Sequence, residues 1–371
     1  MEVFFMKKSF LKTLAVLFAA GTVFFASGCA TMSKAGKQAS ITATVVSADK
    51  YGNCTLSVTA DEFTAGGFEA GDMTSVKAGT FAYDAPVCTN YSDVDNGKYL
   101  IRVSKGKVSL AINMGNFAKT SGAAENTQVT VSLKKKAGYL KEYQIRQLKK
   151  SEDRSAYASD EVFANFRAVK AGKIAQNRLY RSCNPVLGDV RAPYAAKLAE
   201  AAKIQTVINL ADSKESASAH MADAPYYASL ADAGNVIFLN MGVSFTDKDF
   251  LVKLHDGLVF LGEHKNGPYL VHCNEGKDRA GFVSAVLEAV NGATLEEMTA
   301  DYMTSFENYF GVKKGTEQYS MIGQTIPDMF KSLNGGKTVT NKNVGAVAEK
   351  YLLTTVGLTS GQLAAVRANL Q

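Results

Sequence analysis

Tryptophan is absent from this sequence, and only four of its 371 residues are histidine. His220, His255 and His264 show none of the spacings typical of metal ligands, so no metal site and no cofactor is implied. The apolar stretch at residues 13–26 is too short to span a bilayer comfortably. The net charge of +6 is modest, and nothing argues for nucleic-acid binding. Hydrophobic residues make up 46% of the sequence, as is typical of a globular protein. Its length corresponds to about two domains.

The first thirty residues carry the features of an export signal. Three lysines between residues 7 and 12 form a basic region, and the apolar stretch at residues 13–26 follows it. This stretch ends in Ala26-Ser27-Gly28-Cys29, which resembles the lipobox of bacterial lipoproteins. We therefore expect residues 1–28 to be a signal peptide that is removed by cleavage.

Cys29 would become the first residue of the mature chain. Its thiol would carry a diacylglyceryl group, and several acyl chains together make a stable membrane anchor. Residues 29–40, which contain mostly small and polar residues, would form a tether. These features predict an extracytoplasmic protein anchored to a bacterial membrane through lipid. The alternative is a simple secretory signal in which this cysteine occurs by chance.

Residues 41–145 are predicted to form a small all-β accessory domain, either a barrel or a sandwich. Short β-branched runs are separated by turns rich in Gly, Asn and Asp; the expected strands are 41–46, 54–58, 99–103, 107–112 and 128–133. Asp95-Asn96-Gly97 predicts a hairpin, because Asn-Gly tolerates the positive φ of a tight turn. Residues 89–93 and 113–117 resemble parts of a β-barrel domain found in S-adenosylmethionine-hydrolysing enzymes. We expect a binding or spacer role for this domain.

Residues 150–335 are predicted to form an α/β domain. Its expected strands are 206–210, 236–241 and 269–272, and its expected helices are 195–204, 246–264, 281–290 and 294–310. Strands that alternate with helices predict a sheet with parallel strands, flanked by helices. Two short helices separated by Gly357 are expected in a C-terminal segment at residues 336–371.

We expect the active site of this domain at the end of the apolar run that leads into His272-Cys273 and in the loop that follows it, from Asn274 to Arg279. The strand would deliver Cys273 to the edge of the sheet where such folds bind ligands. Backbone N–H groups of the loop and the following helix N-terminus can then converge on an anion, and Arg279 adds a planar fork of donors. The same positive field favours the nucleophilic thiolate. The expected phosphate-binding residues are Asn274, Glu275, Gly276, Lys277, Asp278 and Arg279.

The string His272-Cys273-x-x-Gly276-Lys277-Asp278-Arg279-x-Gly281 resembles the signature loop of the atypical bacterial tyrosine/lipid phosphatases. These enzymes belong to the cysteine-dependent protein tyrosine phosphatase superfamily. Upstream, residues 165–167 and 179–185 resemble that family's opening motifs, and residues 206–210 resemble its first core strand, with Asn209 where the family often has Asp. The resemblance implies hydrolysis of a phosphomonoester. Cys273 would attack phosphorus, and water would then release phosphate from the phosphocysteine.

The general acid of that reaction is a separate question. Standard protein tyrosine phosphatases use an aspartate on a loop marked by Trp-Pro-Asp, and a sequence without tryptophan lacks that marker. The resemblance points instead to Asp278, with Lys277 beside it. The alternative is that Asp278 pairs with Arg279 or caps the following helix. Other aspartates are further candidates, in the order Asp212, Asp247 and Asp249.

Two positions depart from the family's pattern. Ala280 stands where most relatives have a hydroxyl that steadies the departing thiolate, so we expect slow breakdown of the phosphocysteine. Glu275 stands where lipid-directed relatives often have Ala or Lys; its charge partly cancels that of Lys277 and should discourage highly phosphorylated inositol lipids. The alternative for Glu275 is a solvated loop tip that faces away from the substrate.

Three other residues near the motif have supporting or open roles. His272 is expected to orient the loop through backbone contacts and not to act as a base, because a thiolate needs none. Cys183 is expected to be a small buried residue, with a resolving thiol for Cys273 as the alternative. The sequence leaves open whether Cys54 and Cys88 form a disulfide.

The sequence therefore predicts a metal-independent, cysteine-dependent phosphomonoester hydrolase of the protein tyrosine phosphatase type, with dual specificity as an option. Its substrates would be phosphorylated proteins or small phosphomonoesters. Sulfur transfer of the rhodanese type is a rival, but the run from Gly276 to Arg279 argues against it. A second rival is a catalytically weak, phosphatase-like surface binding module. Ala280 and the missing Trp-Pro-Asp marker favour that rival, whereas the intact Cys273 and Arg279 oppose it.

Overall fold

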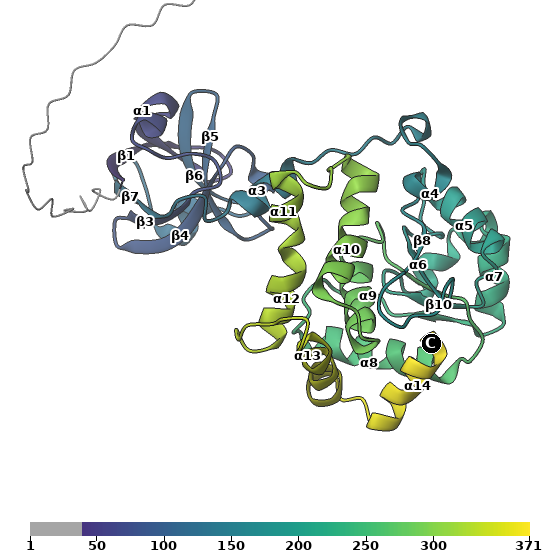
Figure 1. Ribbon diagram of the computed structural model, residues 1–371. Coiled ribbons are helices and arrows are strands. Elements are labelled where there is room, and N and C mark those ends of the chain that lie inside the picture. Colours follow the sequence, from purple (N-terminus) through teal and green to yellow (C-terminus); the bar gives the residue numbers. More distant parts are fainter. Residues whose placement is uncertain (1–38) are drawn as a thin grey trace, which may run out of the picture. The chain divides into compact units, whose positions relative to one another are not determined.

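The computed structural model describes residues 39–371. The predictions for the signal peptide, for Cys29 and for most of the tether lie outside these residues. The N-terminal part is a closed barrel of seven strands in the order β1-β2-β6-β5-β4-β3-β7 (Figure 1). Its strands are β1 Ser40–Ala48, β2 Cys54–Thr59, β3 Met73–Ala78, β4 Phe81–Cys88, β5 Tyr99–Ser104, β6 Lys107–Ile112 and β7 Gln128–Lys135. Its short helices are α1 Ala60–Ala65 and α2 Phe117–Ser121, and α3 Leu140–Gln147 follows β7. The prediction of a small β domain is confirmed in this general form.

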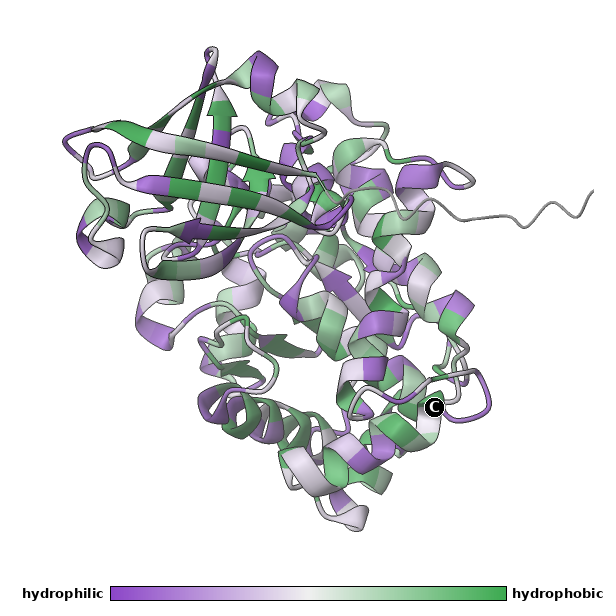
Figure 2. Cartoon of the chain, turned by 90° about the vertical axis from the view of Figure 1, so that its left-hand side faces the viewer, coloured by the Kyte–Doolittle hydropathy of each residue, from purple (hydrophilic) through white to green (hydrophobic). Residues whose placement is uncertain are grey.

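Side chains along the barrel strands alternate between the interior and the surface, because successive residues of a strand point to opposite faces. In β3, Thr74, Val76 and Ala78 are buried, whereas the residues between them are exposed. Figure 2 shows hydrophobic and hydrophilic positions alternating along these strands. Cys54 and Cys88 are both buried free thiols, so no disulfide joins them.

Two features of the barrel differ from the prediction. The strands β3 and β4 were missed, since β3 has few β-branched residues and β4 contains Asp84 and Pro86, which are disfavoured in strands. The hairpin predicted at Asp95-Asn96-Gly97 is wrong. Gly97 does adopt a φ of +80° in a turn, but β4 before the turn pairs with β5 in parallel orientation. A parallel pair needs a longer crossover than a two-residue hairpin.

The C-terminal part contains a five-stranded mixed sheet in the order β11-β10-β12-β9-β8. Figure 1 labels two of these strands, β8 and β10. The strands are β8 Arg167–Ala168, β9 Leu179–Ser182, β10 Thr206–Asn209, β11 Val236–Phe238 and β12 Tyr269–His272. Only β8 is antiparallel to its neighbour. The helices are α4 Asp160–Phe163, α5 Ala192–Ala201, α6 Lys214–Ser218, α7 Pro225–Asp232, α8 Lys248–Glu263, α9 Arg279–Val290, α10 Leu295–Phe310, α11 Glu317–Gly323, α12 Thr325–Leu333, α13 Val344–Lys350 and α14 Ser360–Leu370. The predicted α/β architecture is confirmed at this level.

Helices cover both faces of this sheet. Val207 and Leu270 pack into a core with α5 and α7, whereas the next residues, Ile208 and Val271, pack into the larger core with α8 and α9. The helix α9 is buried at every residue after Arg279, as expected for a central helix. No helix within residues 39–371 is long and apolar enough to cross a membrane.

Two of the sequence signals that follow α9 are confirmed by the structure. Thr294 and Glu297 form the predicted capping box at the start of α10, each bonding the other's backbone N–H. Gly357 separates α14 from the preceding helical segment with a φ of +89°. That segment continues α13 as a π-helical turn over Tyr351–Val356, which the sequence did not predict. The helix α14 packs against α8 and completes the larger core.

Candidate active site

Cys273 follows the central strand of the mixed sheet. The strand β12 pairs with β10 on one side and with β9 on the other, and both neighbours run parallel to it. His272 is in register with Asn209 and Ser182, the last residues of those two strands. Parallel strands present their carboxyl ends at one edge of a sheet, so the segments after β9 and β10 flank Cys273. Cys273 is buried, with 2% of its surface exposed.

The loop after Cys273 is held from outside by its carbonyl groups. The carbonyl oxygen of Asn274 accepts a hydrogen bond from the backbone N–H of Asn184 at 3.2 Å. The carbonyl oxygen of Glu275 accepts two, from Tyr309 Oη at 2.7 Å and from Asn165 Nδ2 at 3.0 Å. These donors come from the segment after β9, from α10 and from the turn between α4 and β8.

Arg181 holds the next two carbonyl groups of the loop. Its guanidinium donates to the carbonyl oxygen of Gly276 from Nε at 3.2 Å and from Nη2 at 2.7 Å. Nη2 also donates to the carbonyl oxygen of Lys277 at 3.1 Å. Four successive carbonyl groups, those of residues 274–277, are therefore bound by groups outside the loop.

The N–H groups of residues 275–278 point away from these anchors, because a trans peptide places its C=O and N–H on opposite sides. None of the four donates a hydrogen bond to a group within residues 39–371. Four unpaired donors on the side of one loop opposite its anchors can form a nest of the kind that binds anions. Gly276 permits this path: its φ is +64°, and an added Cβ would lie 2.1 Å from the carbonyl oxygen of Ser182.

Arg181 is itself fixed in the core by Asp301. Its side chain is fully buried, and Nη1 pairs with Asp301 Oδ2 at 2.5 Å, while Arg167 Nε pairs with Asp301 Oδ1 at 2.9 Å. Burial raises the pKa of Asp301, but the charges of Arg167 and Arg181 outweigh it and lower the pKa to about 2. Asp301 therefore stays ionised and keeps the Arg181 fork aligned with the loop.

Glu288 lies on α9 beside this network, and the sequence analysis did not single it out. It is fully buried, and neither carboxyl oxygen has a hydrogen-bond partner among the residues that the structure describes. Burial and the charge of Asp301 raise the pKa of Glu288 well above its ordinary value. The fold therefore favours the protonated, neutral form of Glu288.

Arg279, the first residue of α9, offers one edge of its guanidinium to a ligand. Nη1 donates to the carbonyl oxygens of Met241 at 2.9 Å and Leu210 at 3.3 Å, which lie beyond the ends of β11 and β10. Nε and Nη2 form no hydrogen bond with any residue from 39 to 371. One nitrogen thus anchors the side chain, and the other two form the planar fork that matches two phosphate oxygens.

His272 is a buried, neutral residue beneath Cys273. Its Nε2 shares a hydrogen bond with Tyr227 Oη at 2.9 Å, and Tyr227 Oη also accepts from Asn209 Nδ2 at 3.2 Å. Burial, together with the charge of Arg279, lowers the pKa of His272 to about 3. The backbone carbonyl of His272 accepts from the N–H of Leu210 at 2.9 Å. These contacts fix the end of the strand; the expected role of His272 in orienting the loop stays a prediction.

Asp212 lies at the same edge of the sheet and is held by two amides. Its Oδ2 accepts from Asn184 Nδ2 at 2.7 Å and from Asn209 Nδ2 at 3.0 Å. Asn184 follows β9 and Asp212 follows β10, so their hydrogen bond spans the end of β12, where Cys273 begins the loop. Asp212 Oδ1 accepts no hydrogen bond from the residues described, 39–371. Sequence reasoning missed Asn184, although the motif at residues 179–185 contained it.

Asp278 is the most exposed of the charged residues in the loop, with 57% of its side chain accessible. Its carboxylate pairs with Lys277 Nζ at 2.9 and 3.0 Å. It neither pairs with Arg279 nor caps α9 through its side chain, so neither alternative structural role is adopted. Lys277 Nζ also lies 5.2 Å from the centre of the Phe306 ring. Burial lowers the pKa of Lys277, but the carboxylates of Asp278 and Glu275 outweigh it and raise the pKa.

The remaining candidate residues lie outside this group of contacts or are buried in it. Asp247 is an exposed residue immediately before α8, and Asp249 pairs with Lys253 on the surface of that helix at 2.8 Å. Cys183 is buried, and burial raises the pKa of its thiol strongly. Ala280 is fully buried behind Arg279.

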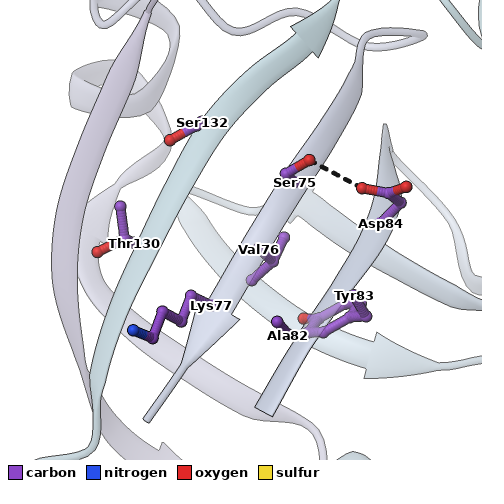
Figure 3. Close-up of a pocket in the computed structure, with 8 residues that line it drawn as sticks. All are labelled: Ser75, Val76, Lys77, Ala82, Tyr83, Asp84, Thr130 and Ser132. Carbon is purple, nitrogen blue, oxygen red and sulfur yellow. Dashed lines mark hydrogen bonds between the residues drawn. The ribbon is translucent and has the colours of Figure 1, made fainter. Parts of the chain in front are cut away.

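A shallow pocket on the barrel is a separate feature (Figure 3). It lies over β3, β4 and β7, where Ser75 Oγ donates to Asp84 Oδ1 at 2.8 Å. Lys77 is the only cation in its lining, and the lining has neither cysteine nor histidine. This pocket therefore offers no counterpart to the thiol of Cys273 and the unpaired N–H groups of the loop that follows it.

The tyrosine phosphatase family matches residues 163–371, which is more than half of the chain. The chain therefore belongs to the tyrosine phosphatase family, and the part that carries Cys273 is a protein-tyrosine-phosphatase-like phosphatase. The match includes residues 336–371, beyond residue 335, the predicted end of the α/β domain. The barrel is similar to the C-terminal domain of S-adenosylmethionine hydroxide adenosyltransferases over residues 43–130, in agreement with the likeness seen at residues 89–93 and 113–117.

Solved structures add weaker similarities, and no curated protein matches the chain. An uncharacterised conserved protein from Thermotoga maritima is 23% identical over 26% of this chain and 36% of its own, with a TM-score of 0.25. A conserved hypothetical protein from Thermus thermophilus is 21% identical over 24% and 34%, with a TM-score of 0.20. The chain thus spans about a third of these two proteins. The core catalytic domain of the PP-IP phosphatase SIW14 from S. cerevisiae, in complex with citrate, is 18% identical over 46% of this chain and 93% of its own, with a TM-score of 0.27. TM-scores below 0.5 do not establish a shared fold.

Proposed function

We propose that this protein hydrolyses phosphomonoesters through a phosphocysteine on Cys273. In the first step the thiolate attacks phosphorus, an S–P bond forms and the ester P–O bond breaks. In the second step water attacks the same phosphorus, the S–P bond breaks, and phosphate and the thiolate are released. The observation that carries this proposal is the set of four unpaired backbone N–H groups, those of residues 275–278, in the loop directly after Cys273.

Charge stabilisation is assigned to the loop and to Arg279. The N–H groups of residues 275–278 would bind equatorial phosphoryl oxygens, and the Nε–Nη2 edge of Arg279 would bind two of them. Both donor sets are anchored before substrate arrives, by Arg181 and by the carbonyl groups of Leu210 and Met241. Preorganised donors of this kind cost little reorganisation during the reaction.

Asp278 is the proposed proton donor to the leaving oxygen and the base that later activates water. Its accessible carboxylate, bound only by Lys277, supports this assignment. Asp212 is the second candidate. Two observations support Asp212 as this candidate: its Oδ1 accepts no hydrogen bond from residues 39–371, and its Oδ2 accepts one from Asn184 across the end of β12.

The proposed substrates are phosphorylated proteins or small phosphomonoesters. We also propose that the protein is a lipoprotein, anchored through Cys29 and exposed outside the cytoplasmic membrane. Metabolic labelling with an alkyne fatty acid tests the anchor: label should be lost in Cys29→Ala. Equal labelling of the variant would refute it.

Turnover of p-nitrophenyl phosphate in the presence of EDTA tests the enzymatic proposal. Hydrolysis that is inhibited by vanadate and abolished in Cys273→Ser would support the cysteine mechanism. Binding of vanadate by the wild-type protein without any turnover would instead favour the phosphatase-like binding module, for which Ala280 is the main argument.

A further inference from the structure

The carboxylate of Glu275 is bound by two lysines. Lys150 Nζ lies 2.5 Å from Oε1, and Lys277 Nζ lies 3.8 Å from Oε2. Lys277 also pairs with Asp278 at 2.9 Å. Four side chains of alternating charge thus follow one another along the outside of the loop. Glu275 is not a free loop tip, because its side chain is only 34% exposed and is ion-paired.

Lys150 comes from outside the part of the chain that matches the phosphatase family, which begins at residue 163. The segment that carries it is fixed by Arg191, which is 1% exposed. Arg191 pairs with Glu152 and donates to the carbonyl oxygen of Ser151. Tyr157 Oη donates to the same carbonyl at 2.7 Å.

Tyr309 connects Lys150 to the backbone of the loop. Lys150 Nζ lies 5.3 Å from the centre of the Tyr309 ring, and Tyr309 Oη donates to the carbonyl oxygen of Glu275 at 2.7 Å. The carboxylate and the carbonyl of Glu275 are therefore bound by neighbouring groups. The Lys150 side chain is 25% exposed, so the ion pair is shielded from solvent more than a surface pair would be.

We propose that the Lys150–Glu275 pair is a specificity element that selects substrates with a single phosphoryl group. This inference rests on the phosphatase function proposed above. A substrate with a second phosphate needs a cation near the loop to bind it. Glu275 occupies Lys150 and shares Lys277 with Asp278, so neither ammonium group is free for that purpose. The expected substrate class is therefore monophosphorylated, such as an aryl monoester, and not a polyphosphorylated inositol.

The test is competition against turnover of p-nitrophenyl phosphate by the full chain. Inhibition constants are measured for inorganic phosphate and for inositol hexakisphosphate, and their ratio is compared between variants. Glu275→Gln frees Lys150 and leaves Lys277 paired with Asp278 alone. The variant should shift the ratio about tenfold in favour of the hexakisphosphate, an effect that about 0.5 M salt should remove. Lys150→Gln leaves Glu275 with Lys277 as its remaining partner of the two and should shift the ratio about threefold the other way. The double variant should lie between the two.

Glu263→Gln is the matched control. Glu263 is exposed at the end of α8, before β12, and therefore at the opposite edge of the sheet from Cys273. Its ratio should equal that of the wild-type protein. If the ratio is unchanged in Glu275→Gln, the inference is overturned while the phosphatase function stays intact. If Glu275→Gln does not fold, an unchanged ratio in Lys150→Gln overturns the inference in the same way. Absence of wild-type turnover would instead refute the proposed function.

Discussion

Arg181 donates two hydrogen bonds to the carbonyl oxygen of Gly276, from Nε at 3.2 Å and from Nη2 at 2.7 Å. This contact joins a buried arginine of β9 to the tightest point of the loop, 95 residues later in the sequence. It orients the peptide after Gly276 so that its N–H points away from Arg181, because a trans peptide places its C=O and N–H on opposite sides. The conformation of the loop is thus set largely by a side chain outside it.

Arg181→Lys should lower kcat/KM for p-nitrophenyl phosphate about 100-fold, because a lysine cannot replace the planar fork and the loop would lose its alignment. Arg167→Lys is the matched control. Arg167 also pairs with Asp301 but does not touch the loop, so its substitution should cost similar stability and much less activity. Equal activity losses in the two variants would mean that Arg181 acts only through stability.

Gly276→Ala should abolish vanadate binding and turnover. A Cβ there would meet the carbonyl oxygen of Ser182 at 2.1 Å, so the backbone must move. Gly292→Ala provides the comparison, since Gly292 has a φ of +83° with nothing near its added Cβ. That variant should lose about 1 kcal/mol of unfolding free energy and keep its activity. Retained vanadate affinity in Gly276→Ala, measured by calorimetry, would contradict the proposed nest.

Glu288→Gln should remove a pH-dependent loss of stability. Because the pKa of Glu288 is raised in the folded state, the native protein holds a proton that the unfolded chain releases above about pH 4.3. The stability that this proton contributes is full below that pH and is lost as pH rises towards the raised pKa. The Tm of wild-type protein should therefore fall relative to Glu288→Gln as pH rises above about 5. A constant difference, like that expected for the exposed Glu263→Gln, would show that Glu288 is ionised in the fold.

The leaving group separates the two candidate acids. Loss of the true proton donor should slow hydrolysis of phenyl phosphate about 100-fold more than hydrolysis of p-nitrophenyl phosphate. Phenolate is a poor leaving group that needs a proton, whereas p-nitrophenolate needs little protonation. We expect this pattern in Asp278→Asn. Asp212→Asn should slow both substrates equally, because it disturbs the end of β12 without removing the acid. The reverse result would assign proton transfer to Asp212.

Local signals in the sequence predicted the elements that carry the candidate site. The run into Cys273, the loop to Arg279 and the capping box of Thr294 and Glu297 each depend on residues close in sequence, so their spacing alone was informative. The barrel strands β3 and β4 were missed because their pattern is weak and their pairing is not local.

Contacts between distant residues could not be read in the same way. Arg181 reaches Gly276 across 95 residues, and Lys150 reaches Glu275 across 125. The buried Glu288 is hidden in a run of apolar residues that reads as an ordinary core helix. These two contacts and the burial of Glu288 depend on which elements the fold places side by side. The periodicity of the sequence does not indicate which elements are neighbours.

Acid quenching during turnover, followed by mass spectrometry of the Cys273 peptide, tests the central claim most directly. The account predicts a phosphoryl group on Cys273. It should accumulate, because Ala280 offers no hydroxyl to the departing thiolate, and Ala280→Ser should reduce its steady-state level. Turnover with no phosphoryl group on Cys273 at any quench time, together with undiminished activity in Cys273→Ser, would contradict the phosphocysteine mechanism.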